Sequence, residues 1–108
     1  MGEKFSEKIA FGSFTTGTYV TYGAAVWSNR RIDMQRPFKE AAIINNLDQD
    51  IEVFDPADIN QPLVTIKASG GSFTFERDNL LHVYYPFLVR NNSGSNATSG
   101  NVVMTMIR

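Results

Sequence analysis

His82 is the only histidine in the chain, and histidine is the residue that most often serves as a general base near neutral pH. In a hydrolytic triad such a base needs an acid to orient it and a nucleophile beside it. The chain contains no Gly-x-Ser-x-Gly segment to supply that nucleophile. Because His82 stands between Leu81 and Val83, it points away from the apolar side of a predicted strand. We expect a surface or interface histidine, no catalytic residue and no enzymatic activity.

A run of acidic residues forms the candidate cation site: Asp48, Asp50, Glu52, Asp55 and Asp58. Hard cations take several oxygen ligands, but the glycine and the terminal glutamate of a calcium-binding loop do not follow here. The chain also lacks cysteine, which excludes thiolate metal sites, thiol catalysis and disulfides. Turn formation and solubility account for the acidic run, so we expect no metal and no cofactor, with a calcium site as the alternative.

Four of the ten basic residues form one cluster, Arg30, Arg31, Arg36 and Lys39. Such a cluster suits nucleic acid or an acidic protein surface. The formal net charge of the chain is nevertheless −1, so the rest of the sequence balances the cluster. We expect an ion pair between subunits or solvated charge, no specific nucleic-acid partner and no membrane partner, because no segment is apolar for long enough to cross a bilayer.

Aromatic side chains in the first third of the chain are the candidate interface residues: Phe5, Phe11, Phe14, Tyr19, Tyr22 and Trp27. Burying a large apolar side chain is worth about 1.5–3 kcal/mol, so these side chains need a partner surface. A neighbouring subunit is one source of that surface, and the core of the same chain is the alternative. Trp27 has the same two interpretations, as a core residue or as an interface anchor.

Apolar and polar residues alternate along short runs in the rest of the chain, as in Leu63–Ala68 and in Ser72–Glu76. This period of two is typical of strands with one buried face. Turn residues, such as Ser69-Gly70-Gly71, separate the runs and favour tight hairpin turns. The predicted strands are Ala41–Leu47, Ile51–Asp55, Leu63–Ala68, Ser72–Glu76, Leu81–Arg90 and Asn101–Arg108.

At 108 residues the chain fits one all-β domain, a small antiparallel β-sandwich or barrel with an extended N-terminal segment. We expect residues 1–40 to form an arm with irregular or strand structure, and residues 41–108 to form the sandwich core. The segment Asn91–Gly100 lacks large apolar anchors and predicts an exposed, mobile loop. The residues predicted to be largely buried are Val64, Ile66, Phe73, Phe75, Val83 and Tyr85.

The last two-thirds of the chain follow an order of pieces that resembles small bacteriophage structural proteins. An asparagine-bearing strand, Ala41–Asn46, comes first, and a Ser/Gly turn with an aromatic strand follows in Ile66–Phe73. An Asn/Ser/Gly loop, Val89–Ser95, then precedes the short terminal strand Met104–Arg108. The resemblance implies a virion component, either a capsid decoration (cement) protein or a small head–tail or tail module, without active-site residues.

From this resemblance we expect a structural protein located in the virion, which stabilises the capsid or joins virion parts through protein–protein contacts. The expected partners are further copies of the chain, in a homo-oligomer for which a trimer is one option, and other virion proteins such as the major capsid protein. The alternative is a β-sandwich module that binds a carbohydrate or a receptor, since exposed aromatic rings stack on sugars.

Overall fold

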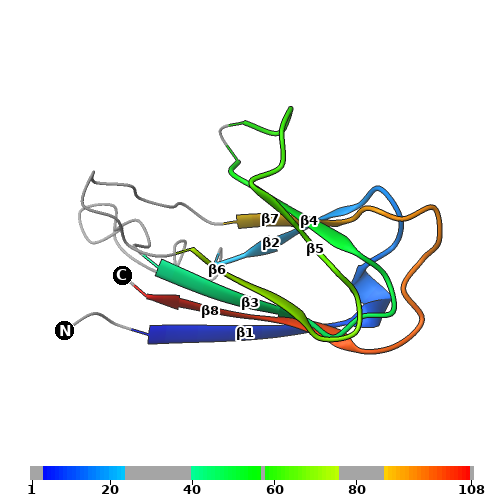
Figure 1. Ribbon diagram of the computed structural model, residues 1–108, viewed down its shortest axis with the longest axis horizontal. Helices are drawn as coiled ribbons and strands as arrows, with labels where there is room; N and C mark the ends of the chain where they lie inside the picture. Colours follow the sequence, from blue (N-terminus) through cyan, green and yellow to red (C-terminus); the bar gives the residue numbers. More distant parts are fainter. Residues whose placement is uncertain (1–3, 24–39, 57, 76–86, 108) are drawn as a thin grey trace.

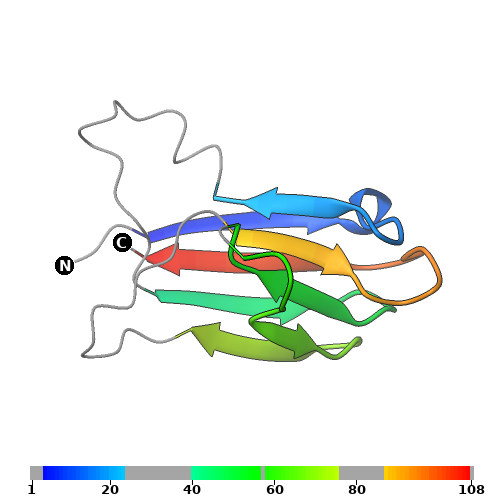
Figure 2. The same ribbon diagram turned by 90° about the horizontal axis from the view of Figure 1, so that it is seen from above.

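Two four-stranded sheets pack face to face in the computed structural model, which describes residues 4–23, 40–56, 58–75 and 87–107 (Figure 1). The first sheet has the strand order β1-β8-β3-β6 and the second has β2-β7-β4-β5, with every pairing antiparallel. Strands of the two sheets run in similar directions when seen from above (Figure 2), as in an aligned sandwich. The predicted all-β sandwich is confirmed. The elements are β1 (Lys4–Ala10), η1 (Phe11–Ser13), β2 (Tyr19–Tyr22), β3 (Glu40–Asn45), β4 (Ile51–Phe54), β5 (Val64–Ile66), β6 (Gly71–Phe75), β7 (Phe87–Asn91) and β8 (Asn101–Ile107).

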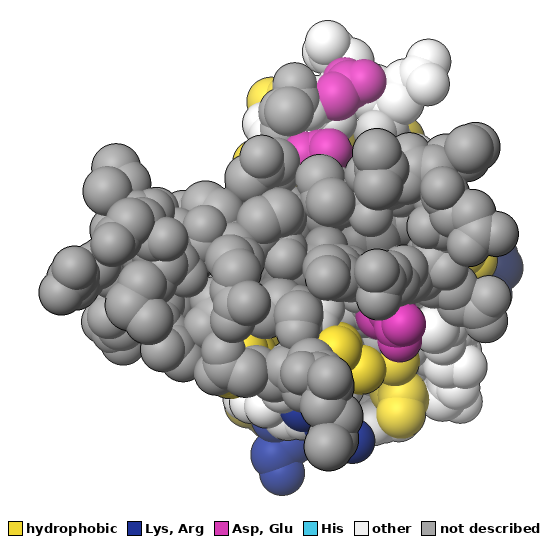
Figure 3. All heavy atoms as spheres, turned by 90° about the vertical axis from the view of Figure 1, so that its left-hand side faces the viewer, with side chains coloured by type: hydrophobic (Ala, Val, Ile, Leu, Met, Phe, Trp, Pro, Cys, Tyr) yellow, Lys and Arg dark blue, Asp and Glu magenta, His cyan; other side chains and the backbone are white. Residues whose placement is uncertain are grey.

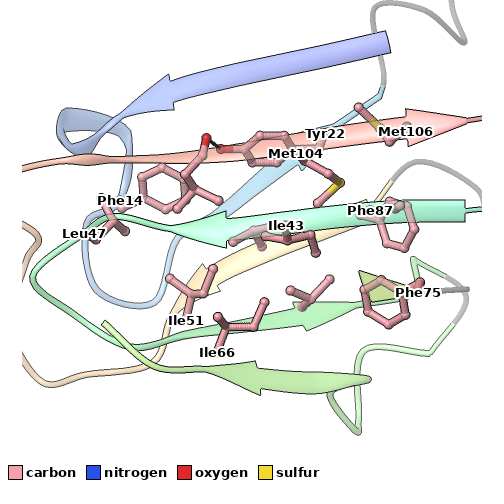
Figure 4. Packing of buried hydrophobic residues seen from close by; sticks show 14 of the residues in the cluster. Phe14, Tyr22, Ile43, Leu47, Ile51, Ile66, Phe75, Phe87, Met104 and Met106 are labelled. Carbon is pink, nitrogen blue, oxygen red and sulfur yellow. Dashed lines mark hydrogen bonds between the residues drawn. The ribbon is translucent and has the colours of Figure 1, made fainter. Parts of the chain in front are cut away.

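Alternating side chains fill the space between the sheets. In β8, Val102, Met104 and Met106 are buried, while the residues between them are partly exposed. Figure 4 shows the methionine side chains between the sheets with Ile43 of β3 and Phe87 of β7. The period of two in the sequence thus places one apolar row of each sheet in a shared core.

Strands from the first third of the chain complete both sheets. β1 pairs with β8 from Lys4 opposite Ile107 to Ala10 opposite Asn101. β2 pairs with β7, and η1 carries the chain from one sheet to the other. Residues 4–23 therefore belong to the sandwich itself rather than to a separate arm. The sequence did not predict β1 as a strand, because charged residues occupy several of its positions. An edge strand can form when only half of its side chains are apolar.

The predicted strands other than Leu81–Arg90 each overlap an observed strand, although β3 and β6 begin one residue before the predicted bounds. Within Leu81–Arg90, β7 begins at Phe87, directly after Pro86, and the preceding part of the run lies outside the described residues. Ser69 and Gly70 adopt positive φ angles, as a tight turn requires. That turn connects β5 of the second sheet to β6 of the first, so it closes one side of the sandwich.

The burial predictions have mixed outcomes. Ile66 and Phe75 are buried, and Val64 is half-buried against the core. The prediction for Phe73 is wrong, since 41% of its surface is exposed. Phe73 faces the core side but lies on β6, at the edge of the first sheet, where no further described strand covers it. Val83 and Tyr85 lie outside the described residues.

Buried hydrogen bonds anchor the loop Asn91–Gly100 in place of large apolar side chains, and its mobility stays a prediction. The Asn91 side chain is 1% exposed and donates to the backbone oxygens of Phe14 (3.1 Å) and Ser95 (2.8 Å). Ala97 is also buried, and its N–H donates to the Phe14 oxygen (3.2 Å). The remaining side chains of the loop are mostly exposed, as expected. None of the helices among the described residues is long and apolar enough to cross a membrane.

Candidate interaction surfaces

The outer face of the first sheet is almost free of charge. On β8, β3 and β6 the outward positions carry one ionisable side chain, Glu40, at the start of β3. We call this the first-sheet face, and its outward side chains are Glu40, Ala42, Ile44, Ser72, Thr74, Asn101, Val103, Thr105 and Ile107. Ile44 is 44% exposed and lies between Val103 of β8 and Ser72 of β6, at the opposite end of β3 from Glu40. A solvated sheet face usually carries polar and charged residues, so this composition suits contact with another surface.

A hollow of about 280 Å³ lies at one end of the first-sheet face. It is lined by Lys4, Glu40, Ala41, Ala42, Thr74, Thr105 and Ile107. Register explains the set, because Lys4 pairs with Ile107, which in turn pairs with Glu40. Beside the hollow the hydroxyls of Ser6 and Thr105 lie 3.0 Å apart. The hollow thus combines hydroxyl and alkyl groups with the ionisable side chains of Lys4 and Glu40.

Lysines stand along one edge of the first-sheet face. Phe5 and Ile9 of β1 pack against the core, so the exposed side chains of Lys4, Ser6 and Lys8 point outward. Neither lysine forms an ion pair within the part of the chain that the structure describes. This edge is therefore a basic rim, and Glu40 is the one ionisable side chain on the outward positions of the adjoining strands β8, β3 and β6.

The outer face of the second sheet carries an ion pair between aromatic rings. The Arg90 guanidinium donates to Glu52 (2.9 Å) and to the Tyr19 hydroxyl (3.2 Å), and the hydrogen bond to Glu52 raises the pKa of Arg90. Its carbon atom Cζ lies 5.0 Å from the centre of the Phe54 ring and 5.2 Å from that of Tyr19. Because these residues come from β2, β7 and β4, the cluster binds the strands of this sheet together and presents Tyr19 in one fixed position.

The described residues 55–56 and 58–63, between β4 and β5, stand out from the second sheet (Figure 1). We call this segment the protrusion. Its described residues from Pro56 onward are exposed, and Ile59 at 50% is the most exposed of the large apolar side chains. Asp55 and Asp58 are its charged residues. An exposed isoleucine that follows two acidic residues has the composition of a contact point for an apolar surface with a basic rim.

The acidic run does not converge on a cation site. Hydrogen bonds from Thr98 lower the pKa of Asp48, and a hydrogen bond from the Ala68 N–H lowers that of Asp50. Glu52 is paired with Arg90, while Asp55 and Asp58 lie on the protrusion. Among the described residues no three groups are placed to hold a metal ion together. The acidic residues that are close in sequence thus have separate partners, in loops for Asp48 and Asp50 and across strands for Glu52.

The structure separates the candidate interface aromatics. Phe14 and Tyr22 are fully buried in the core of their own chain, so the expectation of an interface role is corrected for these two residues. They close the core because η1 and β2 bring them between the sheets. Phe5 is half-buried against the same core, whereas Phe11 and Tyr19 are exposed. Trp27, His82 and the basic cluster from Arg30 to Lys39 lie outside the described residues.

Sequence reasoning did not single out the first-sheet face or the protrusion. A strand pattern identifies which residues alternate, but the outward rows of three strands become one surface only when the strand order is known. Comparison with protein-family models, with curated proteins and with solved structures gives no match. These surfaces are therefore the basis for a functional argument.

Proposed function

We propose that this chain is a structural component of a bacteriophage particle, where it stabilises the capsid or joins virion parts through protein–protein contacts. The observation that carries the proposal is the first-sheet face, which presents Ile44 and uncharged neighbours on three adjacent strands. The centres of protein interfaces are depleted in charged residues, and this face shares that depletion. A rigid sheet also loses little conformational freedom when it docks.

The proposed partners are further copies of the chain and other virion proteins, including the major capsid protein. The sandwich buries its core between the two sheets, so the first-sheet face is not needed to complete the fold of one subunit. No described strand or loop covers its apolar side chains, so contact with another molecule would remove them from water. The resemblance of the strand and loop order to small phage structural proteins supports the same role.

The second candidate is a module that binds a carbohydrate or a receptor, and Tyr19 is the observation that favours it. Its partly exposed ring is held edge-on against Phe54 at a centroid distance of 5.4 Å and is fixed by Arg90. A fixed aromatic ring is a suitable platform for the apolar face of a sugar. Glycan-array binding that is lost in Tyr19→Ala and retained in Ile44→Asp would favour this candidate over the virion role.

Co-sedimentation with phage shells tests the virion role. Purified protein is mixed with shells of the phage that encodes it, and bound protein is measured after centrifugation. We expect saturable binding that weakens at least tenfold in Ile44→Asp, which places a charge on the first-sheet face. Thr21→Asp, an exposed position on β2 of the other sheet, is the matched control and should bind like wild type. Shells that bind no wild-type protein would overturn the proposal.

A further inference from the structure

We infer that copies of this chain associate head to tail, with the protrusion of one copy docked on the first-sheet face of the next. The inference rests on the proposed structural role and names the partner surface and the geometry of assembly. In this contact an exposed acidic loop with an apolar tip, the protrusion, packs on an apolar sheet face with lysines along its edge.

The protrusion is ordered before it meets a partner. Its N-terminal part is a turn in which the Asp58 N–H donates to the Asp55 oxygen (2.9 Å). The Asp58 carboxylate then accepts from the Asn60 N–H (3.1 Å), and the Leu63 N–H donates to the Val53 oxygen (2.7 Å). Pro56 and Pro62 restrict φ near its two ends. A loop held in this way loses little entropy on binding, so its exposed tip can contribute directly to affinity.

Charge on the protrusion is of one sign. Its described residues include Asp55 and Asp58 and no lysine or arginine. Figure 3 shows acidic side chains on this projecting part at the top, and basic side chains at the opposite side of the molecule, where β1 lies in Figure 1. Ile59 and Leu63 are the exposed apolar residues of the protrusion. The protrusion thus requires a partner with an apolar centre and a basic rim.

The first-sheet face meets both requirements. Ile44, Val103 and Ile107 provide apolar surface, and Lys4 and Lys8 stand along its β1 edge. Contact would bring Ile59 against alkyl groups and place the carboxylates of the protrusion near ammonium groups. Complementary charge favours the correct orientation and speeds encounter.

Geometry decides the type of assembly. The protrusion rises from the second sheet, whereas the first-sheet face is the outer surface of the other sheet (Figure 1). Because the two surfaces lie on opposite sides of the molecule, a copy that docks through one of them leaves the other available. Such a heterologous contact continues from copy to copy and forms either a closed ring or an open filament.

Analytical ultracentrifugation of two variants tests the inference. Ile59→Ser removes the apolar tip, and Ile44→Asp places a charge on the face that repels the protrusion. Both positions are exposed, so the circular dichroism spectrum of each variant should equal that of wild type. We expect wild type to form oligomers of the 12.1 kDa chain and each variant to self-associate at least tenfold more weakly. Phe11→Ser, an exposed position on η1, is the control and should associate like wild type.

Mixing the two variants gives the sharpest result. The intact face of Ile59→Ser can accept the intact protrusion of Ile44→Asp, and no further copy can add. An equimolar mixture should therefore form a dimer and stop there. Wild type that stays monomeric up to about 1 mM would overturn the inference; a dissociation constant of that size corresponds to about 4 kcal/mol of binding free energy. A mixture that stays monomeric while wild type associates would also overturn it. A monomeric chain that still binds shells would overturn this inference alone, whereas a chain that associates but binds no shell would overturn the proposed function alone.

Discussion

At the scale of single residues, two buried asparagines order the loops at one end of the sandwich. Asn45 accepts from the Leu47 N–H (3.0 Å) and donates to the Gln49 oxygen (2.9 Å). Asn91 repeats this arrangement, accepting from the Ser93 N–H (2.9 Å) and donating to the Ser95 oxygen (2.8 Å). Each follows an inward-facing apolar row, on β3 and β7. In the sequence both belong to an Asn-Asn pair, and nothing in the pair indicates which member is buried.

Replacing each buried asparagine by alanine should lower the free energy of unfolding by about 1–3 kcal/mol, because buried backbone groups lose their partners. The measurement is urea unfolding of Asn45→Ala and Asn91→Ala. Their exposed neighbours provide the matched controls. Asn46→Ala and Asn92→Ala should each lower the free energy of unfolding by less than about 0.5 kcal/mol. Equal losses within each pair would contradict the assignment of the loop anchors to Asn45 and Asn91.

Tyr22 should make stability depend on pH in the alkaline range. Its hydroxyl is buried and donates to the Val102 oxygen (2.7 Å), and burial, together with nearby Glu7, raises the pKa of Tyr22. In the unfolded chain a tyrosine ionises near pH 10. Above that pH the unfolded state loses a proton that the folded state keeps, so the stabilisation from Tyr22 is complete below pH 10 and decreases above it.

Unfolding experiments on Tyr22→Phe check this expectation. At pH 7 the variant should be less stable than wild type by about 0.5–1.5 kcal/mol, the contribution of one buried hydrogen bond. Above pH 10 the difference should shrink, since phenylalanine cannot ionise. A difference that stays constant from pH 8 to pH 11 would show that the Tyr22 hydroxyl ionises as readily in the folded state as in the unfolded one.

At the scale of elements, the strands that the sequence predicted well are those with strict alternation and clear turn residues. β6 alternates Phe73 and Phe75 with Ser72 and Thr74 directly after a Ser/Gly turn, and a period of two has one structural interpretation there. β1 was missed because its inward residues Phe5, Glu7 and Ile9 include a charge, whose carboxylate accepts from the Gly23 N–H (2.6 Å). The burial of Phe73 was overestimated because a pattern gives the face of a residue and not its distance from the sheet edge.

Removal of the first 22 residues should prevent folding. The truncated chain loses β1 and β2 and exposes the core surface that Phe14 and Tyr22 cover. We expect no cooperative urea transition and a disordered circular dichroism spectrum. Two full-length variants test the role of burial without shortening the chain. Phe14→Ala should lower the free energy of unfolding by about 3–5 kcal/mol, and Phe11→Ala, at an exposed position, should lower it far less. A truncated chain that unfolds cooperatively would show that residues 41–108 form an independent domain.

At the scale of the whole molecule, the sandwich has two different outer surfaces. The first-sheet face is flat and uncharged at its centre, whereas the second sheet carries the Arg90–Glu52 pair and the acidic protrusion. Composition and alternation predicted the sandwich, since they depend on neighbours in sequence. They did not predict the two surfaces, which combine residues as distant as Ile44 and Val103. A subunit with unlike opposite sides suits repeated assembly, and this is the central element of the proposed function.

The protein composition of purified phage particles tests that claim most directly. Particles of the phage that encodes the chain are banded in a density gradient, and the chain is quantified by mass spectrometry against the major capsid protein. We predict a fixed number of copies per particle for wild type and for Thr21→Asp, and a loss of at least tenfold for Ile44→Asp at equal expression. Particles without the wild-type chain, or with Ile44→Asp at the wild-type level, would contradict a structural role through the first-sheet face.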